Sequence, residues 1–295
     1  MERTSIAILG LGLVGGSLGF RLREAGHHIS GFDVSQERLE TALHLGAIDI
    51  VKASAEAAAQ NCDFVFIATP VGAIASTVSK ILPSLGPETI VTDVGSVKRP
   101  IMESIAALRP PFPFIGGHPM AGSEQGGIAA ADPNLFENAV YVLTPLQGDL
   151  SGDESLGRLI SLIEHDLGAN VMVMDPGVHD EVVAAVSHLP HVAAAALVNA
   201  LGMAAEKTPV ALALAAGGFR DTTRVASGLS KLWADICLHN RAPILRSIAY
   251  LQDELERVQE ALLTQDITDL EDFFGQARAL RAKVPIAQRG LLPPL

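Results

Sequence analysis

Three glycines near the N-terminus, Gly10, Gly12 and Gly15, have the spacing G-x-G-x-x-G. They follow an apolar run that is typical of a strand and begin a segment that is typical of a helix. The first glycine permits a tight turn, the second lets the backbone approach a pyrophosphate, and the third allows the helix to pack closely on the strand. An anion is favoured at such a helix N-terminus, because free N–H groups and the helix dipole both point to it. The loop, with Leu13 and Val14, therefore predicts a dinucleotide-binding site.

Asp33 ends the second predicted strand, at the distance expected for a residue that contacts the adenosine ribose. A carboxylate there accepts hydrogen bonds from the ribose hydroxyls and repels a 2′-phosphate. Because the next cationic residue is Arg38, the sequence favours NAD, with NADP as the less favoured cofactor. The alternative is an aspartate that only caps the next helix. Thr69 and Pro70, which follow a later apolar run, are included in the predicted cofactor site.

Four polar motifs further along the chain contain residues suited to proton transfer and carboxylate binding. Neutral imidazole can accept a proton near pH 7, and arginine binds a carboxylate through two parallel hydrogen bonds. The first two motifs each follow a predicted strand, so they are expected at the carboxyl edge of a sheet, where ligands bind in doubly wound folds. The motifs are DVGSVK at 93–98, GGHPMAGSE at 116–124, SHLPH at 187–191 and GGFRDTTR at 217–224, followed by Trp233 and Asn240.

With GHPMAGSE, SHLPH and FRDTTR in this order, the sequence resembles the prephenate/arogenate (cyclohexadienyl) dehydrogenase family of tyrosine biosynthesis. The resemblance runs from the glycine loop to about Asn240, and the later helical segments are consistent with it. It implies an NAD(P)-dependent oxidative decarboxylation of prephenate, arogenate or both. Hydride leaves ring C4 for the cofactor, the C4 hydroxyl loses its proton, and the ring carboxylate departs as CO2. The product is 4-hydroxyphenylpyruvate or tyrosine.

The resemblance also implies the catalytic residues. His118 matches the catalytic histidine of the family, and as a neutral imidazole it can take the hydroxyl proton. Ser96 matches a serine that hydrogen-bonds the substrate hydroxyl and the nicotinamide region. From the residues alone two alternatives stay open: His118 can be a loop residue that caps a turn, and Ser96 can be the N-cap of a helix that begins near Val97.

The expected substrate is a small dicarboxylate, and an acidic protein needs local cations to bind it. Arg224 is implied as the substrate anchor, and Arg220, four residues earlier, is expected on the same helical face. The alternative for Arg220 is a surface ion pair with Asp221 or Glu206.

His191 is implied to line the substrate pocket, with support from His188 three residues earlier. The alternative for His188 is an ordinary buried histidine with satisfied hydrogen bonds. A zinc site would need further ligands, for which His179, Asp180 and Glu181 are the nearby candidates, and the sequence predicts no metal.

Short β-rich runs alternate with helical runs in residues 1–175, which predicts an α/β fold with a Rossmann-type, doubly wound parallel sheet. After Asp175 the strand signals stop, and residues 176–295 are expected to form an all-helical dimerisation domain. The expected strands are 5–9, 28–32, 63–69, 89–94, 114–116, 140–144 and 170–174. The expected helices are 14–25, 36–45, 71–82, 97–108, 156–167, 178–205, 209–216, 220–226, 229–240, 243–264 and 267–283.

Length and composition agree with this two-domain organisation. At 295 residues, 48% of them hydrophobic, the chain is long enough for two folded cores. The net charge of −12 argues against nucleic acid and anionic membranes as partners. The two cysteines, Cys62 and Cys237, exclude a disulfide framework and favour a reducing compartment, so a cytoplasmic location is expected.

An uncharged segment at 182–205 is long enough to span a bilayer. It contains polar residues that are costly in lipid, so a buried helix in a large folded core is expected instead. These residues are Ser187, His188, Pro190, His191 and Asn199. The apolar helical part is expected to bury some of its surface against a second copy, which predicts a homodimer through residues 176–295.

Two other functions stay open on the sequence. One is a different dehydrogenase with a Rossmann half and a helical half, of the 3-hydroxyacid or imine type. The 3-hydroxyacid type uses a lysine base, and Lys207 and Lys231 lack such a context. The other is a non-catalytic, NAD-sensing dimer, which the loss of His118 or Arg224 would have indicated.

Overall fold

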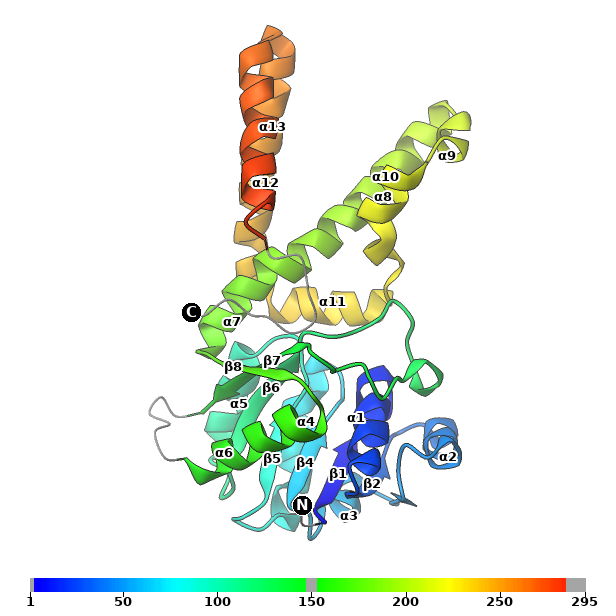
Figure 1. Ribbon diagram of the computed structural model, residues 1–295, viewed down its shortest axis with the longest axis vertical. Helices are drawn as coiled ribbons and strands as arrows, with labels where there is room; N and C mark the ends of the chain where they lie inside the picture. The colour runs from blue at the N-terminus through cyan, green and yellow to red at the C-terminus, as the bar shows by residue number, and fades with distance from the viewer. Residues whose placement is uncertain (1–2, 147–152, 285–295) are drawn as a thin grey trace.

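An eight-stranded sheet forms the core of the N-terminal part, with the strand order β3-β2-β1-β4-β5-β6-β7-β8 (Figure 1). The computed structural model describes residues 3–146 and 153–284. The strands are β1 (Ser5–Leu9), β2 (His28–Phe32), β3 (Ile50–Val51), β4 (Phe64–Ile67), β5 (Ile90–Asp93), β6 (Phe114–Pro119), β7 (Val140–Pro145) and β8 (Asn170–Val173). The direction of strand order reverses between β1 and β4, and this switch point brings the loops after both strands together at the carboxyl edge.

Helices cover both faces of the sheet, and each face has its own apolar core cluster. This arrangement explains why β4 and β5 are buried along their whole length, since strands covered on both faces need continuous apolar runs. One cluster includes α1 (Leu13–Glu24), α2 (Gln36–Leu45), α6 (Glu154–Ser161) and the π-helix η3 (Leu162–Asp166). The other includes α3 (Ala55–Ala59), α4 (Val71–Ile81) and α5 (Arg99–Leu108). The short 3-10 helices are η1 (Leu82–Ser84) and η2 (Ile128–Ala130). The predicted doubly wound sheet is confirmed.

The strand β7 departs from the all-parallel sheet that the sequence predicts, because it runs antiparallel to β6. Residues 120–139 between these strands contain only the one-turn η2 and no α-helix. A parallel return needs a crossover of a dozen or more residues, usually a helix, so the chain returns antiparallel. The pairing extends β6 to Pro119, and His118, expected on a loop, lies within this strand opposite Val142.

Two short elements, β3 and α3, are missing from the sequence prediction. A two-residue strand and a five-residue helix are too short to show a periodic pattern of apolar residues. The start of α3 has a local signal, because the hydroxyl of Ser54 accepts a hydrogen bond from the N–H of Ala57 at 3.2 Å.

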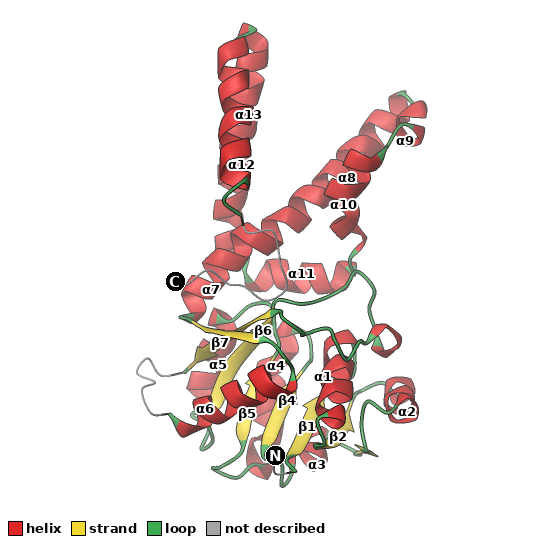
Figure 2. Cartoon of the chain, in the orientation of Figure 1, coloured by secondary structure: helices red, strands yellow, loops and turns green. Residues whose placement is uncertain are grey.

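Beyond β8 the described chain is helical, as predicted (Figure 2). The elements are α7 (Pro176–Val183), the π-helix η4 (Ala184–His188), α8 (Leu189–Lys207), α9 (Val210–Ala213), α10 (Gly217–Thr223), the 3-10 helix η5 (Arg224–Ser227), α11 (Ser230–His239), α12 (Arg241–Thr264) and α13 (Ile267–Arg281). Ile236 of α11 belongs to the core cluster of α4 and α5, so α11 packs on the sheet domain. Two arms extend away from it, α12 with α13 and α8 with α9 and α10. Residues 285–295 of the predicted helical domain lie outside the described residues.

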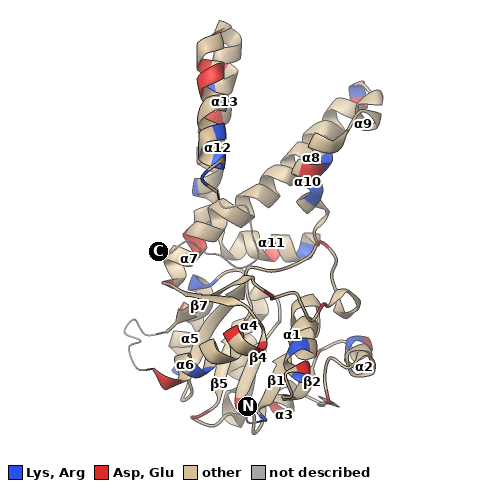
Figure 3. Cartoon of the chain, viewed as in Figure 1, with Lys and Arg blue, Asp and Glu red and all other residues tan. Residues whose placement is uncertain are grey.

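The apolar segment 182–205 is not the buried core helix that the sequence predicts. With its neighbours it forms one helical run, Pro176–Lys207, which is long and apolar enough to cross a membrane by length and composition alone. Only 22% of its most apolar window is buried within the chain, because α8 belongs to an arm that extends away from the sheet. Figure 3 shows that most of α8 carries no charged side chain. Exposed apolar surfaces of this extent typically mark a site of interaction with another molecule.

Candidate active site

The glycine loop joins β1 to α1 at the switch point of the sheet. Gly10 has a φ of 103°, which favours glycine, and a Cβ on it would lie 2.5 Å from a carbonyl oxygen of the loop after β4. A Cβ on Gly15 would lie 1.9 Å from the carbonyl oxygen of Gly10, so the helix packs directly on the loop. The space around Gly12 is open, and α1 begins after it without a side-chain cap. The first-turn N–H groups, including those of Leu13 and Val14, are therefore available to an anion.

Asp33 lies directly after β2 and is buried. Its Oδ2 accepts a hydrogen bond from the N–H of Leu11 at 2.8 Å, and its Oδ1 accepts one from the N–H of Ser35 at 2.8 Å. The cap of α2 is Ser35, whose hydroxyl accepts from the N–H of Arg38, so Asp33 is not the helix cap that the alternative proposed. The guanidinium of Arg38 is half-exposed and lies 3.7 Å from Asp33 Oδ1.

Thr69 and Pro70 lie between β4 and α4, across the switch point from the glycine loop. The hydroxyl of Thr69 is buried and has no hydrogen-bond partner among the described residues. Pro70 precedes α4, in whose first turn the N–H of Gly72 donates to Asp235 Oδ2 of α11 at 3.3 Å. Buried polar groups in proteins are almost always hydrogen-bonded, so an unpaired hydroxyl beside the uncapped N-terminus of α1 indicates a polar ligand. These residues fit the pyrophosphate and hydroxyl groups of a dinucleotide.

The backbone before His118 is held by a buried ion pair between Lys98 and Asp93, neither of which has exposed side-chain area. The N–H of Gly117 donates to Asp93 Oδ1 at 3.2 Å, and its carbonyl oxygen accepts from Lys98 Nζ at 2.7 Å. A Cβ on Gly117 would lie 2.4 Å from the carbonyl oxygen of Asp93, so only glycine fits there. Burial lowers the pKa of Lys98, and the carboxylate of Asp93 opposes that shift.

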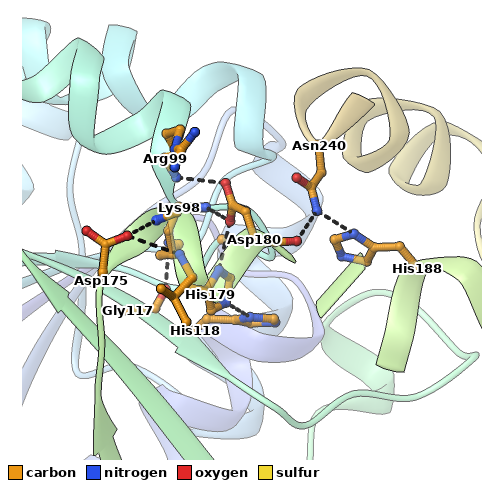
Figure 4. Close-up of polar contacts among 12 residues, drawn as sticks. Lys98, Arg99, Gly117, His118, Asp175, His179, Asp180, His188 and Asn240 are labelled. Atoms are coloured by element: carbon orange, nitrogen blue, oxygen red, sulfur yellow. Dashed lines mark hydrogen bonds and ion pairs between the residues drawn. The ribbon is translucent and has the colours of Figure 1, made fainter. Parts of the chain in front are cut away.

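The ring of His118 belongs to a chain of three side chains that Figure 4 shows. Nδ1 of His118 lies 2.8 Å from Nε2 of His179, and Nδ1 of His179 lies 2.8 Å from Oδ1 of Asp180. The same carboxylate accepts from the N–H of Lys98 at 2.7 Å and from that of Arg99 at 2.9 Å, at the start of α5. The chain therefore joins the sheet, α5 and the first helix of the helical part.

The pKa of His118 is held well below 6.5, first by burial and then by the nearby His179, Lys98 and His188. The ring is therefore neutral near pH 7. Its Nδ1 is engaged by His179, whereas its Nε2 has no hydrogen-bond partner within residues 3–146 and 153–284. A neutral imidazole accepts a proton at its bare nitrogen, so His118 can act as a base if that nitrogen is Nε2.

The helical run from α7 to α8 contains the π turn η4 at the SHLPH motif. The N–H of Leu189 donates to the carbonyl oxygen of Ala184, five residues earlier, and Pro190 follows in the first turn of α8. Proline has no N–H and crowds the preceding turn, so a helix that continues through it has to widen or bend. The turn leaves His188 buried and His191 half-buried, with different neighbours.

His188 has one buried nitrogen that no described residue satisfies. Its Nδ1 lies 3.0 Å from the amide nitrogen of Asn240, which also donates to the carbonyl oxygen of Asp180 at 2.8 Å. Because the amide donates, Nδ1 of His188 accepts, and the proton of the neutral ring is on Nε2. Burial lowers the pKa of His188 to about 4, so the ring is neutral, and its buried Nε2 has no partner. The described residues therefore satisfy only one of the two ring nitrogens of His188.

His191 lies flat against Trp233 of α11, with ring centroids 3.6 Å apart and an angle of 25° between the planes. Its Nδ1 lies 2.9 Å from the carbonyl oxygen of Ser187 and therefore donates to it, which leaves Nε2 as an acceptor in the neutral ring. Burial lowers the pKa of His191. The stacking and the hydrogen bond together fix the direction of the ring.

The two arginines, four residues apart, belong to different elements and have different neighbours. The helix α10 ends at Thr223, and Arg224 begins the 3-10 helix η5. Arg224 forms an ion pair with Glu124 of the GGHPMAGSE motif. Arg220 lines an open groove of about 700 Å³ with residues of α8 and α9, and Glu206 also lines it. Arg220 forms no ion pair with a described residue.

Ser96 lies between β5 and α5, at the same sheet edge as His118. It is half-buried, and its hydroxyl has no hydrogen-bond partner in the described part of the chain. It is not the N-cap that the alternative proposed, because α5 begins at Arg99 and the carboxylate of Asp180 takes the capping position. Its hydroxyl is free for a ligand.

Several residues that hold this site together have no role predicted from the sequence. Asp93, Lys98 and Glu124 are within the polar motifs, and Asn240 follows the last of them. For His179 and Asp180 the sequence suggests only a role as metal ligands. The available signal was position, since DVGSVK follows β5 and the His-Asp pair begins the first helix after the sheet.

Comparisons with known proteins agree with the fold. The nucleotide-binding domain of prephenate dehydrogenase matches residues 18–173, and the dimerization domain of prephenate dehydrogenase matches residues 175–276. A prephenate dehydrogenase of Bacillus subtilis (strain 168) is 36% identical over 295 residues, which are 99% of this chain and 79% of that protein.

Two solved structures extend the likeness to three dimensions. A Synechocystis arogenate dehydrogenase is 35% identical with a TM-score of 0.79, over 95% of this chain and 99% of that one. A prephenate dehydrogenase from A. aeolicus, in complex with hydroxyphenyl propionate and NAD+, is 30% identical with a TM-score of 0.86, over 97% of this chain and 99% of that one. The chain belongs to the prephenate dehydrogenase family, NAD(P)-dependent dehydrogenases that carry out the oxidative decarboxylation of prephenate or arogenate.

Proposed function

We propose that His118 is the general base of this reaction and takes the proton of the substrate hydroxyl at its Nε2. The observation that carries the proposal is the buried, neutral ring of His118, held at Nδ1 and free at Nε2, at the ligand-binding edge of the sheet. Ser96, with a free hydroxyl at the same edge, orients the substrate hydroxyl toward this nitrogen.

The chemistry needs little more than a base and correct placement. When bound, NAD+ supplies the acceptor for the hydride that leaves ring C4. His118 removes the hydroxyl proton. The carbon–carbon bond between the ring and its carboxylate breaks, and its electron pair enters the ring as CO2 departs. Because the ring becomes aromatic, the product side is strongly favoured, and residues that hold the substrate in place supply the remaining rate enhancement.

The carboxylates of the substrate are held by cationic and neutral donors on the helical side. Arg224 is the main anchor, and it exchanges its partner Glu124 for a substrate carboxylate. The buried Nε2–H of His188, which has no partner in the described chain, donates a hydrogen bond to the substrate. His191, fixed against Trp233, lines the pocket, and Arg220 contributes a second positive charge nearby.

The cofactor occupies the edge between the glycine loop and the start of α4. The N–H groups after Gly12 bind the pyrophosphate, and Asp33 binds the adenosine ribose. The hydroxyl of Thr69 and the turn at Pro70 complete this side. The carboxylate of Asp33 repels a 2′-phosphate, so NAD is the preferred cofactor. Arg38 beside it allows weaker binding of NADP.

Turnover of both substrates with both cofactors tests the proposed function. Purified protein is incubated with prephenate or arogenate and with NAD or NADP, and reduced cofactor is followed by its absorbance. We expect turnover of at least one substrate, with a higher kcat/KM for NAD than for NADP. A protein that binds NAD but turns over neither substrate would contradict the function, and equal kcat/KM for the two cofactors would contradict the role of Asp33.

The exposed apolar arm built on α8 is covered by a second copy of the chain. Its exposed side chains include Leu197, Met203, Leu212 and Leu214, and residues 175–276 match a dimerization domain. Burial of this face in a homodimer removes the need for a lipid environment, so we expect a cytoplasmic protein with no membrane or nucleic-acid partner. We propose that the boundary between the domains lies near residue 175.

Sedimentation velocity at micromolar concentration tests the dimer without detergent. We expect a dimer, and exchange of Leu197 and Leu212 for lysine should shift it toward monomer because charge on the buried face opposes association. Val34→Lys, at an apolar and even more exposed residue outside the helical part, is the control and should leave the dimer intact. A wild-type monomer rules the proposal out.

A further inference from the structure

We infer that His179 is a positioning residue that fixes the tautomer and direction of His118, with Asp180 behind it as the anchor. His118 Nδ1 lies 2.8 Å from His179 Nε2, and His179 Nδ1 lies 2.8 Å from Asp180 Oδ1. The inference rests on the proposed role of His118 as the base. It adds which nitrogen of that base is bare and what keeps it so.

The direction of each hydrogen bond follows from the carboxylate at the end of the chain. An ionised Asp180 only accepts, so Nδ1 of His179 must donate to it. In the neutral ring of His179 the other nitrogen, Nε2, is then bare and accepts from Nδ1–H of His118. Nδ1 of His118 therefore carries the proton, and Nε2 is the nitrogen left bare. A free histidine in water prefers the opposite tautomer, so the protein imposes this one.

The ring of His179 is 1% exposed, so its hydrogen bonds to His118 and Asp180 are shielded from water. The ring planes of His118 and His179 are at 75°, an edge-on arrangement that brings a ring N–H of one toward a ring nitrogen of the other.

Asp180 is itself held from three sides, so the chain has a fixed end. Its two oxygens accept from the N–H groups of Lys98 and Arg99 at the start of α5, and its carbonyl oxygen accepts from Asn240 at 2.8 Å. These donors come from the sheet domain and from the junction of α11 and α12. The tautomer of His118 is thus set by the way the helical part sits on the sheet domain.

Two substitutions at His179 separate positioning from folding. Phenylalanine keeps a buried ring of similar shape but cannot accept from His118, whereas glutamine places its side-chain oxygen near the position of Nε2 and can accept. We expect His179→Phe to lower kcat roughly 10- to 100-fold, the usual loss when the partner that orients a functional histidine is removed, with KM changed less than about threefold. We expect His179→Gln to retain kcat within about fivefold of the wild type.

Nitrogen-15 NMR of the full-length protein, labelled in its histidine side chains, tests the tautomer of His118 without substrate. The signals of His118 are identified by their absence in His118→Asn. We expect the Nδ1–H form of His118 in the wild type and in His179→Gln, and the Nε2–H form or a mixture in His179→Phe. An Nε2–H form of His118 in the wild type overturns the inference. A His179→Phe variant with the kcat of the wild type overturns it too, and so does a His179→Gln variant whose kcat is as low as that of His179→Phe. If His179→Phe does not fold, the wild-type spectrum and His179→Gln still decide. Because the spectrum needs no turnover, a protein inactive on both substrates contradicts the function and not the tautomer.

Discussion

Replacement of His118 by asparagine is expected to lower kcat by a factor of about 10² to 10⁴, the usual contribution of a positioned general base. The asparagine amide can take the place of Nδ1 and donate to His179, so the buried chain of hydrogen bonds is retained while the bare Nε2 is lost. Steady-state formation of NADH from the preferred substrate measures the effect. A kcat within about threefold of the wild type would show that His118 is not the base.

A matched variant at the substrate anchor Arg224 should change KM rather than kcat. Arg224→Gln removes a charge that binds a carboxylate in both the ground state and the transition state, so KM should rise while kcat changes little. Loss of one charge-assisted contact of about 1.5 to 3 kcal/mol corresponds to a rise of roughly 10- to 150-fold. The affinity for NAD, measured by fluorescence titration, should be unchanged in both variants. If His118→Asn weakens NAD binding as much as it lowers kcat, its effect is structural.

The pH dependence of the wild type follows from the same base. His118 is active when neutral, and its pKa is held well below 6.5 by burial and then by His179, Lys98 and His188. As the pH falls through 6.5 the ring therefore stays neutral, and kcat/KM for the free enzyme should decline only at lower pH. The slope at low pH should disappear from the residual activity of His118→Asn. A decline centred above pH 7 would contradict the buried environment of this ring.

The second large effect is on stability, and it is expected from the replacement of Lys98 by methionine. Asp93 would then be a buried carboxylate without its cation, since both side chains have no exposed area. Breaking a buried ion pair in this way typically costs about 3 to 5 kcal/mol of the free energy of unfolding. At about 2 to 4 °C per kcal/mol for a domain of this size, the melting temperature of the sheet domain should fall by roughly 6 to 20 °C. Thermal unfolding followed by circular dichroism measures the change.

A double variant shows whether the loss comes from the unpaired charge. In Asp93→Asn/Lys98→Met the charge is removed, while the asparagine oxygen can still accept from the N–H of Gly117. We expect the double variant to regain at least half of the decrease in melting temperature seen in Lys98→Met. The effects of substitutions at two contacting charges on stability do not add, because removing the second charge relieves the cost of leaving it unpaired. The ion pair is not what stabilises this edge if Lys98→Met alone lowers the free energy of unfolding by less than about 1 kcal/mol. The same conclusion follows if the double variant is no more stable than Lys98→Met.

Local patterns in the sequence were enough to predict the sheet domain and the family. The glycine loop, the strand–helix alternation and the three ordered motifs each depend on residues close together in the chain, and each was predicted with its place in the fold. Ser96 and His118 were expected at the carboxyl edge because both motifs follow strands, and the structure has them at that edge. A strand of two residues has no such pattern, which is why β3 was not predicted.

Contacts between residues remote in the chain were decided only by the tertiary structure. His179 contacts His118 across 61 positions, and the backbone N–H of Lys98 donates to the carboxylate of Asp180 across 82, so no local pattern contains either pair. The antiparallel β7, the π turn at Pro190 and the separation of Arg220 from Arg224 likewise depend on how neighbouring elements pack. The sequence by itself therefore determined which elements form and which residue types meet a ligand, since these follow from side-chain periodicity and turn chemistry. The direction of each hydrogen bond at the base, and the exposed apolar arm on α8, followed only from the packing of one domain on the other.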